Sequence, residues 1–170
     1  MKIRNYDEIE VLPDSLVILD LDETLIQFEG MYDKWWEDNL IHSNELEVYR
    51  RWIQLISFTM PHMLDSYEFN NLLRRIKQTN SRMVILTARS AKLCEITLQQ
   101  LVYCNIIIPL DDIYFSDKKG RMAHSIKRRY TYSNVIFVDD RKSNIRDVKI
   151  WIPDAICYHI RHTNLNKKLL

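Results

Sequence analysis

The sequence predicts a Rossmann-like α/β fold, a three-layer α/β/α sandwich around a mostly parallel, five-stranded sheet. Short apolar runs rich in β-branched and aromatic residues alternate along the chain with segments in which apolar residues recur at helical spacing. Such alternation builds βαβ units with right-handed crossovers, and hence a parallel sheet covered by helices. A chain of 170 residues has the length of one domain, so we expect a single domain over residues 1–170.

Five strands and four helices follow from this pattern. The strands are expected at residues 15–20, 82–87, 112–115, 134–139 and 155–159. The helices are expected at residues 67–78, 90–102, 121–129 and 144–151. Ligands of open α/β sheets bind at the edge where the parallel strands end, so polar residues just after these strands are the candidates for a functional site.

Residues 31–66 interrupt the alternation, and we expect them to form a small helical cap inserted after the first strand. Helical spacing extends over residues 44–60, and Pro61 is expected to end the second helix of the cap. The insertion is rich in aromatic residues, namely Trp35, Trp36, Tyr49, Trp52 and Phe58. Aromatic residues at helical spacing usually pack in a core, so most are expected to pack the cap onto the domain and one or two to face a substrate.

Composition excludes several classes of protein. The chain is 46% apolar and 28% charged, as in ordinary globular domains, and its net charge of +1 indicates neither a nucleic-acid-binding arm nor an acidic tail. Its apolar runs are far shorter than the roughly 20 residues of a membrane span, and its start lacks the apolar region of a signal peptide. We therefore expect a cytoplasmic protein with no membrane partner; the sequence predicts no particular oligomeric state.

The cysteine and glycine content of the chain excludes further kinds of site. The three cysteines, Cys94, Cys104 and Cys157, are odd in number and lack Cys-x-x-Cys spacing, so reduced, buried thiols are expected. Gly30 and Gly120 are the only glycines. A glycine-rich dinucleotide fingerprint or a P-loop needs more, so both of these nucleotide-binding motifs are excluded.

Two carboxylates directly follow the first expected strand. Asp20 and Asp22 stand at the end of an apolar run and therefore face the ligand-binding edge of the sheet. Two acids held this close repel each other unless a cation or a proton lies between them, which indicates a metal-assisted acid/base or nucleophilic centre. The alternative is a pair that accepts backbone N–H groups in a turn or at a helix N-cap.

A second acidic pair, Asp139 and Asp140, ends the fourth expected strand at the same edge. Four converging carboxylates repel one another without a hard divalent cation such as Mg²⁺, which prefers carboxylate oxygens, water and phosphate as ligands. The sequence therefore indicates a Mg²⁺ site. For Asp140 the alternative is a helix N-cap, because Asp is a favoured cap residue.

Two further positions suit a bound phosphate. Thr87 ends the second expected strand beside a helix start capped by Ser90, where N–H groups and the helix dipole favour an anion. Lys118 and Lys119 precede a helix, and a lysine there neutralises both a phosphoryl group and a nucleophilic carboxylate. Lys119 is favoured because it directly precedes Gly120. The alternatives are a capping threonine and a solvated basic loop.

Together these segments resemble the motifs of the haloacid dehalogenase superfamily of phosphatases and phosphotransferases. The match comprises Asp20-Leu-Asp22-Glu-Thr24 for the first motif, Thr87 for the second, Lys119 for the third and Asp139-Asp140 for the fourth. The order and spacing of these motifs extend over residues 15–160. The stretches that follow the second and fourth motifs look most like a little-characterised branch with a short lid.

The resemblance implies a Mg²⁺-dependent phosphatase that works through an aspartyl-phosphate. It implies that Asp20 is the nucleophile, that Asp22 is the general acid and base, and that Thr87 and Lys119 bind the phosphoryl oxygens. The implied metal ligands are Asp20, Asp22 through its backbone carbonyl, Asp139 and, directly or through water, Asp140. No further cofactor is expected.

Four more residues are expected around this site. Thr24 is expected to support the first loop, and Asn144 to orient the turn that follows the fourth expected strand. Arg89 and Arg141 are expected either to reach substrate phosphate or to pair with nearby acids, and pairing at the surface is the commoner case.

The expected substrate is a small phosphomonoester, and two alternatives stay open. The first is a phosphatase for nucleic-acid or protein phosphates, which the near-neutral net charge opposes. Basic residues around the third motif favour it, namely Lys118, Lys119, Arg121, Lys127, Arg128 and Arg129. The second is a non-catalytic binding protein on the same fold, which the presence of both Asp20 and Asp22 opposes.

Overall fold

Six parallel strands form the central sheet of the computed structural model, which describes residues 1–31 and 35–162. Their order across the sheet is β1-β8-β7-β2-β5-β6. The strands are β1 (Lys2–Ile3), β2 (Ser15–Leu19), β5 (Arg82–Thr87), β6 (Ile113–Phe115), β7 (Asn134–Asp139) and β8 (Ile156–Ile160). The predicted fold class and all five predicted strands are confirmed. The sixth strand, β1, is a two-residue edge strand parallel to β8 and was not predicted.

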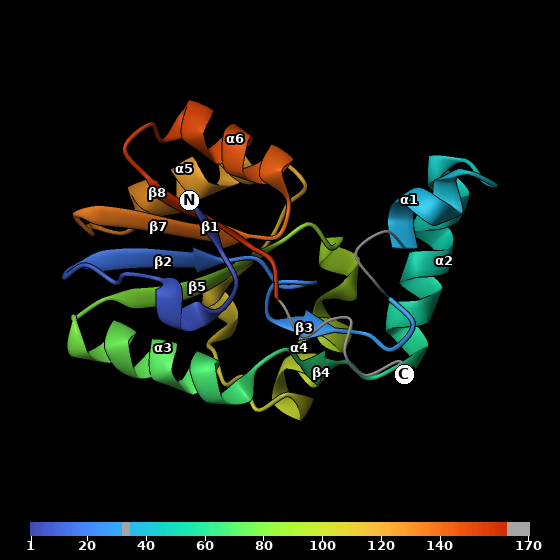
Figure 1. Cartoon of the computed structure of the whole chain (residues 1–170), viewed down its shortest axis with the longest axis horizontal. Coiled ribbons are helices and arrows are strands. Elements are labelled where there is room, and N and C mark those ends of the chain that lie inside the picture. The colour runs from blue at the N-terminus through green and yellow to red at the C-terminus, as the bar shows by residue number, and fades with distance from the viewer. Residues whose placement is uncertain (32–34, 163–170) are drawn as a thin grey trace.

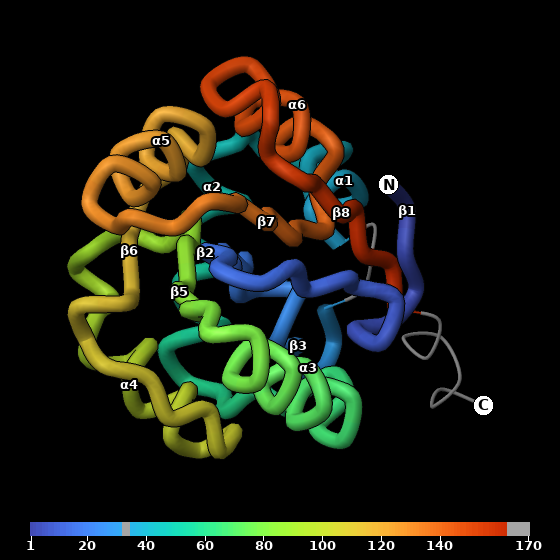
Figure 2. The backbone as a smooth tube through the Cα atoms, turned by 90° about the vertical axis from the view of Figure 1, so that its left-hand side faces the viewer, coloured from blue at the N-terminus to red at the C-terminus, as the bar shows by residue number. Residues whose placement is uncertain are grey.

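The helices cover both faces of the sheet, as the alternating pattern predicts. Figures 1 and 2 show α5 and α6 on one face and α3 and α4 on the other. The bounds are α3 (Ser66–Gln78), α4 (Cys94–Tyr103), α5 (Lys119–Arg129) and α6 (Lys142–Trp151). Short 3-10 turns precede α4 and β6, at Ala91–Leu93 and Leu110–Asp112. Because of these turns, α4 and β6 begin later in the sequence than the periodicity predicts.

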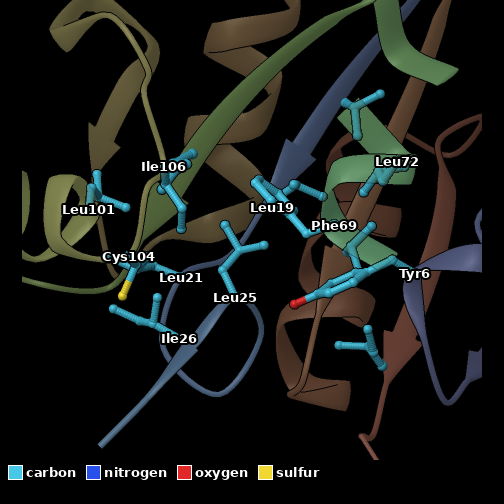
Figure 3. Close-up of a cluster of buried hydrophobic side chains, with 14 of the residues drawn as sticks. Tyr6, Leu19, Leu21, Leu25, Ile26, Phe69, Leu72, Leu101, Cys104 and Ile106 are labelled. Atoms are coloured by element: carbon cyan, nitrogen blue, oxygen red, sulfur yellow. The ribbon is translucent and has the colours of Figure 1, made fainter. Parts of the chain in front are cut away.

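Strand β2 divides the core into two layers because its side chains alternate between the faces. Val17 and Leu19 belong to the cluster on the side of α3, whereas Leu16 and Ile18 belong to the cluster on the side of α5 and α6. Every residue of β2 is buried, with β5 on one flank and β7 on the other. Figure 3 shows the first cluster, in which Leu19 lies near Phe69 and Leu72 of α3. The strand that carries the first acidic pair is therefore the most enclosed part of the sheet.

The insertion after β2 forms two helices, α1 (Trp35–Leu40) and α2 (Glu45–Phe58). Figure 1 shows them together at one end of the molecule, beyond the short antiparallel pair β3 (Ile26–Gln27) and β4 (His62–Met63). The side chain of Asn44 caps the start of α2, and α2 ends before Pro61, as the helix-breaking property of proline predicts. Residues 32–34 of the predicted cap and 163–170 of the predicted domain lie outside the described residues.

Two sequence-based expectations about the rest of the chain can be compared with the structure. No helix in residues 1–31 and 35–162 is long and apolar enough to cross a membrane. Cys104 and Cys157 are buried free thiols, as predicted, whereas Cys94 is only half-buried at the start of α4.

Helices α5 and α6 approach each other closely at Gly120. A Cβ atom at this position would collide with the backbone oxygen of Asp147 and lie 2.5 Å from Cδ1 of Trp151. The backbone N–H of Gly120 also donates to the Asp147 carboxylate at 2.7 Å. Glycine is therefore required where these two helices cross.

The Gly120→Ala substitution is expected to lower the free energy of unfolding by about 1–3 kcal/mol, because overpacking outweighs the better helix propensity of alanine. Urea unfolding of the two proteins measures this difference. Ser125→Ala, at an exposed position of the same helix, is the control and is expected to leave stability unchanged or slightly raised. A Gly120→Ala protein as stable as the wild type would contradict the close approach.

Candidate active site

Three carboxylates meet where β2 and β7 end. Asp20 directly follows β2, and its backbone N–H donates to the Val138 carbonyl of β7 at 2.9 Å, so the two strand ends are held in register. One oxygen from each of Asp20, Asp139 and Asp140 lies within 4.8 Å of the others. Asp20 and Asp139 are buried, and Asp140 is half-buried. The structure thus brings the first and fourth motifs together, as the strand order requires.

Lys119 is a buried cation in contact with this cluster. Its side chain is only 1% exposed, and its ammonium group donates to the Asp20 carboxylate and to the Leu86 carbonyl at the end of β5. The same group lies 3.9 Å from Oδ2 of Asp139. Lys118, by contrast, points outward and pairs with Asp117 at 3.5 Å. Of the two lysines considered from the sequence, Lys119 is the one that reaches the acidic cluster.

The cluster holds more negative charge than Lys119 balances, and this imbalance shows in the pKa values. Burial, followed by the charge of Asp20, raises the pKa of Asp139 well above its ordinary value, with Lys119 acting in the opposite direction. Burial and Asp20 raise the pKa of Asp140 to about 8, against the opposing charge of Arg141. Three close carboxylate donors at one sheet edge fit a hard divalent cation, which would offset their mutual repulsion.

Asn144 holds the Asp139 carboxylate in place. Its Nδ2 lies 3.0 Å from both oxygens of Asp139, and the backbone N–H of Arg141 donates to Asp139 Oδ1 at 2.8 Å. Asn144 therefore makes the contact expected of it. Asp140 does not cap the following helix: the N-cap position of α6 is Arg141, and no side-chain cap bond forms there. The carbonyl of Asp140 instead lies 2.8 Å from the His159 ring.

Asp22 lies beside the cluster, and its carboxylate is bound by Arg89. Arg89 donates from Nε to Oδ2 at 2.9 Å and from Nη2 to Oδ1 at 2.7 Å. The Arg89 side chain is fully buried, so this pairing occurs in the interior and not at the surface, where such pairing is commoner. The third guanidinium nitrogen, Nη1, donates to Thr97 Oγ1 at 3.0 Å and to Gln100 Oε1 at 2.7 Å, both on α4.

Gln100 extends this network to the insertion. Its Nε2 donates to the Ile56 carbonyl in the last turn of α2, at 2.5 Å. The buried chain Asp22–Arg89–Gln100–Ile56 therefore connects the first motif to the insertion through two side chains. This network could not be predicted from the sequence, because Thr97 and Gln100 lie within an ordinary helical pattern and become partners of Arg89 only through the tertiary fold.

Thr87 and Thr24 occupy the positions expected of them at the ends of β5 and the first loop. Thr87 is buried, and its Oγ1 accepts the backbone N–H of Arg89 at 3.2 Å, which makes the hydroxyl hydrogen the remaining donor. Oγ1 of Thr24 lies 3.5 Å from Asp20 Oδ2, and the Thr24 carbonyl accepts bonds from Tyr6 and His162. Thr24 therefore ties the loop that follows the two acids to the core.

A cavity of about 570 Å³ opens over the acidic cluster. Asp20, Asp22 and Asp140 lie at one side of it. The insertion contributes four aromatic residues to its lining, namely Trp35, Trp36, Tyr49 and Trp52, and the segments after β7 and β8 contribute Arg141, Lys142 and Arg161. Asp20, Asp22, Asp140 and the aromatic residues of the insertion thus face a common space, whereas the predicted site residues Thr87, Lys119 and Asp139 do not line it.

Solved structures share this fold, although no protein-family model and no curated protein sequence matches the chain. The class C acid phosphatase from Bacillus anthracis matches with a TM-score of 0.55 at 13% identity, over 94% of this chain and 70% of its own. A chain of the Pnkp1/Rnl/Hen1 complex matches with a TM-score of 0.51 at 17% identity, over 94% of this chain. DsGPDH of Dunaliella salina matches with a TM-score of 0.47 at 18% identity, over 85% of this chain.

The chain spans 50% of the matched chain in the Pnkp1/Rnl/Hen1 complex and 23% of DsGPDH. At such identities, the likeness to the class C acid phosphatase and to the chain of the Pnkp1/Rnl/Hen1 complex shows a shared fold.

Without a metal ion, the stability of the fold is expected to decrease as the pH rises from about 4 to about 8. The unfolded chain releases the Asp140 proton near the ordinary value of 3.8, whereas the folded protein holds it up to a pKa of about 8. The stabilisation is therefore complete below the lower value and is lost as the pH passes the higher one.

The Asp140→Asn substitution removes this titration. The free energy of unfolding of the variant, relative to that of the wild type, is therefore expected to increase between pH 4 and pH 8, by up to about 1.4 kcal/mol per pH unit. Urea unfolding in the presence of a chelator, at several pH values, measures the difference. Asp111→Asn, an exposed carboxylate outside the site, is the matched control. The same pH trend in both variants would contradict the assignment to Asp140.

Proposed function

We propose that the protein is a Mg²⁺-dependent phosphatase that hydrolyses a phosphomonoester through an aspartyl-phosphate on Asp20. The observation that carries this proposal is the contact of the Asp20 carboxylate with buried Lys119, beside Asp139 and Asp140 and at the wall of a cavity. The class C acid phosphatase that shares the fold has also been solved with tungstate, a tetrahedral oxyanion like phosphate. Its activity is consistent with the one proposed here.

In the first step, a carboxylate oxygen of Asp20 forms a bond to phosphorus while the bond from phosphorus to the leaving oxygen breaks. We assign the phosphoryl oxygens to two donors, the Thr87 hydroxyl and the Lys119 ammonium group. Thr87 ends β5, which flanks β2, and Lys119 extends from the first turn of α5 to the Asp20 carboxylate and the Leu86 carbonyl of β5. Lys119 also reduces the repulsion between the Asp20 carboxylate and the incoming phosphate.

Asp22 serves as the general acid and then as the general base. It gives a proton to the leaving oxygen in the first step, and in the second it takes a proton from the water that attacks phosphorus and releases Asp20 and phosphate. Both Asp22 oxygens accept bonds from Arg89, so proton donation requires that at least one of these bonds opens. Arg89 is therefore a positioning residue for Asp22.

Asp20, Asp139 and Asp140 are the side chains that would hold Mg²⁺, together with the Asp22 backbone carbonyl. When bound, the ion supplies positive charge that offsets the charge of the transferring phosphoryl group. Asn144 keeps the Asp139 carboxylate oriented toward the other two.

The two alternatives carry less support. The basic residues around the third motif do not form one cationic surface, because Lys119 is buried and Lys127 pairs with Asp154 at 3.1 Å. A non-catalytic binding protein would have no need of Asp20 and Asp22 at the same strand end beside a buried lysine. We therefore favour the enzyme.

Asp20→Asn is expected to lower the turnover of an aryl phosphate at least about a thousandfold, because an amide does not replace the nucleophile. Steady-state rates with Mg²⁺, before and after treatment with a chelator, measure the effect. The surface variant Asp154→Asn is the control for an Asp-to-Asn change and is expected to keep wild-type activity. Undiminished turnover by the Asp20→Asn protein, or wild-type turnover after complete chelation, would contradict the proposal.

Asp22→Asn is expected to separate the two steps. Hydrolysis of an alkyl phosphate falls at least about a hundredfold, because its leaving oxygen needs a proton. 2,4-Dinitrophenyl phosphate needs none in the first step, so rapid mixing gives a burst of about one equivalent of dinitrophenolate per enzyme, followed by slow turnover. Equal losses with both substrates and no burst would exclude Asp22 from the acid/base role.

A further inference from the structure

The aromatic residues of the insertion have no part in the chemistry proposed above, although they line the same cavity. Trp35 and Trp36 come from α1, and Tyr49 and Trp52 from α2. The Tyr49 and Trp52 rings are stacked, with centroids 5.7 Å apart and planes at 28°. Trp35 and Trp36 lie with centroids 6.2 Å apart. This group, Trp35, Trp36, Tyr49 and Trp52, is called the aromatic wall below.

Packing of the insertion accounts for only part of this wall. Trp52 is 8% exposed and belongs to the core, whereas Trp35 and Trp36 of α1 pack against the core but are only partly buried. A short helix that keeps two large apolar rings at the wall of a cavity offers them to a ligand. The phosphoryl group itself does not need such rings, so they serve the leaving group of the substrate.

A basic segment lies between the aromatic wall and the acidic cluster. Arg141 and Lys142 directly follow the Asp139-Asp140 pair and line the cavity. The Arg141 guanidinium lies 5.8 Å from the centre of the Trp36 ring, so it joins the two parts of the site. The same lining holds Glu37, whose carboxylate is a suitable acceptor for an N–H group of a ligand.

We propose that the leaving group is a nucleoside: the cavity binds a nucleotide with its base against the tryptophans of α1 and its terminal phosphomonoester at Asp20. Stacking on aromatic rings, a nearby arginine and a volume of about 570 Å³ fit a base, a sugar and a phosphate together. This inference rests on the proposed phosphatase function. A free nucleoside monophosphate and the phosphorylated end of an oligonucleotide share this chemistry.

Matched substrates with and without a base test the inference. With Mg²⁺ present, kcat/KM is measured for the 3′- and 5′-monophosphates of adenosine, for ribose 5-phosphate and for short oligonucleotides with a 3′- or 5′-terminal phosphate. The kcat/KM of a base-containing substrate is expected to exceed that of ribose 5-phosphate at least about tenfold, since stacking on an aromatic ring strengthens binding by that order of magnitude. Preference for a mononucleotide or for an oligonucleotide end identifies the source of the ligand.

Variants of Trp36 then test whether the aromatic wall causes the preference for base-containing substrates. Trp36→Leu is expected to raise KM for the preferred nucleotide at least about fivefold while leaving kcat and the ribose 5-phosphate reaction nearly unchanged. Trp36→Phe, which keeps a ring, restores most of the affinity. Trp151→Leu, on α6 and outside the cavity lining, is the matched control and keeps the wild-type KM.

A binding measurement separates failure of this inference from failure of the proposed function. Titration of the Asp20→Asn protein with the nucleotide, followed by tryptophan fluorescence, needs no turnover and is expected to show quenching that Trp36→Leu reduces and Trp151→Leu does not. Quenching without turnover of any substrate by the wild type would overturn the phosphatase but support the nucleotide site. Equal hydrolysis of ribose 5-phosphate and nucleotides, unaffected by Trp36→Leu, would overturn the nucleotide site alone.

Discussion

The contact between Lys119 and Asp20 is the interaction on which the candidate site depends. Three carboxylates converge on one sheet edge, and a buried ammonium group among them offsets part of their repulsion. Lys119 reaches this position from the first turn of α5, and the next residue, Gly120, is where α5 comes closest to α6. The close approach at Gly120 therefore determines the position of α5, the helix that carries Lys119. Two adjacent residues thus set the packing of this helix and supply the positive charge of the site.

The arrangement of the sheet explains why this edge tolerates such a concentration of charge. β2 lies in the middle of the sheet, with apolar side chains on both faces, so its end is rigid. The acids come just after the apolar run, where backbone and side-chain groups such as Asn144 satisfy their oxygens. The core stabilises the fold, and at the strand ends the carboxylates repel one another, a repulsion that a bound cation would reduce.

Most of the fold could be predicted because its signals are local. The strand at residues 134–139 was expected at the bounds that β7 has, since a continuous apolar run is distinct from its surroundings. The two residues of β1 show no periodicity, so nothing in the sequence identified that strand. The contact of Asn144 with Asp139 could be predicted for the same local reason, because the two residues are only five positions apart.

The parts of the site that could not be predicted depend on distant segments. The choice between Lys118 and Lys119 follows from the direction in which α5 leaves the sheet. The burial of Arg89 follows from two polar residues on one face of α4. The aromatic wall was recognised as a set of residues, but which rings line the cavity depends on how the insertion sits over the strand ends.

The insertion is held more firmly at the end of α2, called its root here, than at α1, called its tip. Gln100 anchors the last turn of α2, and a buried polar group that lost this partner would be costly, so the root resists displacement. The tip, α1, has no fully buried residue, and its two tryptophans are only partly buried against the core. Substitutions in α1 can therefore alter which molecules enter the cavity while the alignment of Asp22 is preserved. Substrate selectivity can thus change without a change in the catalytic residues.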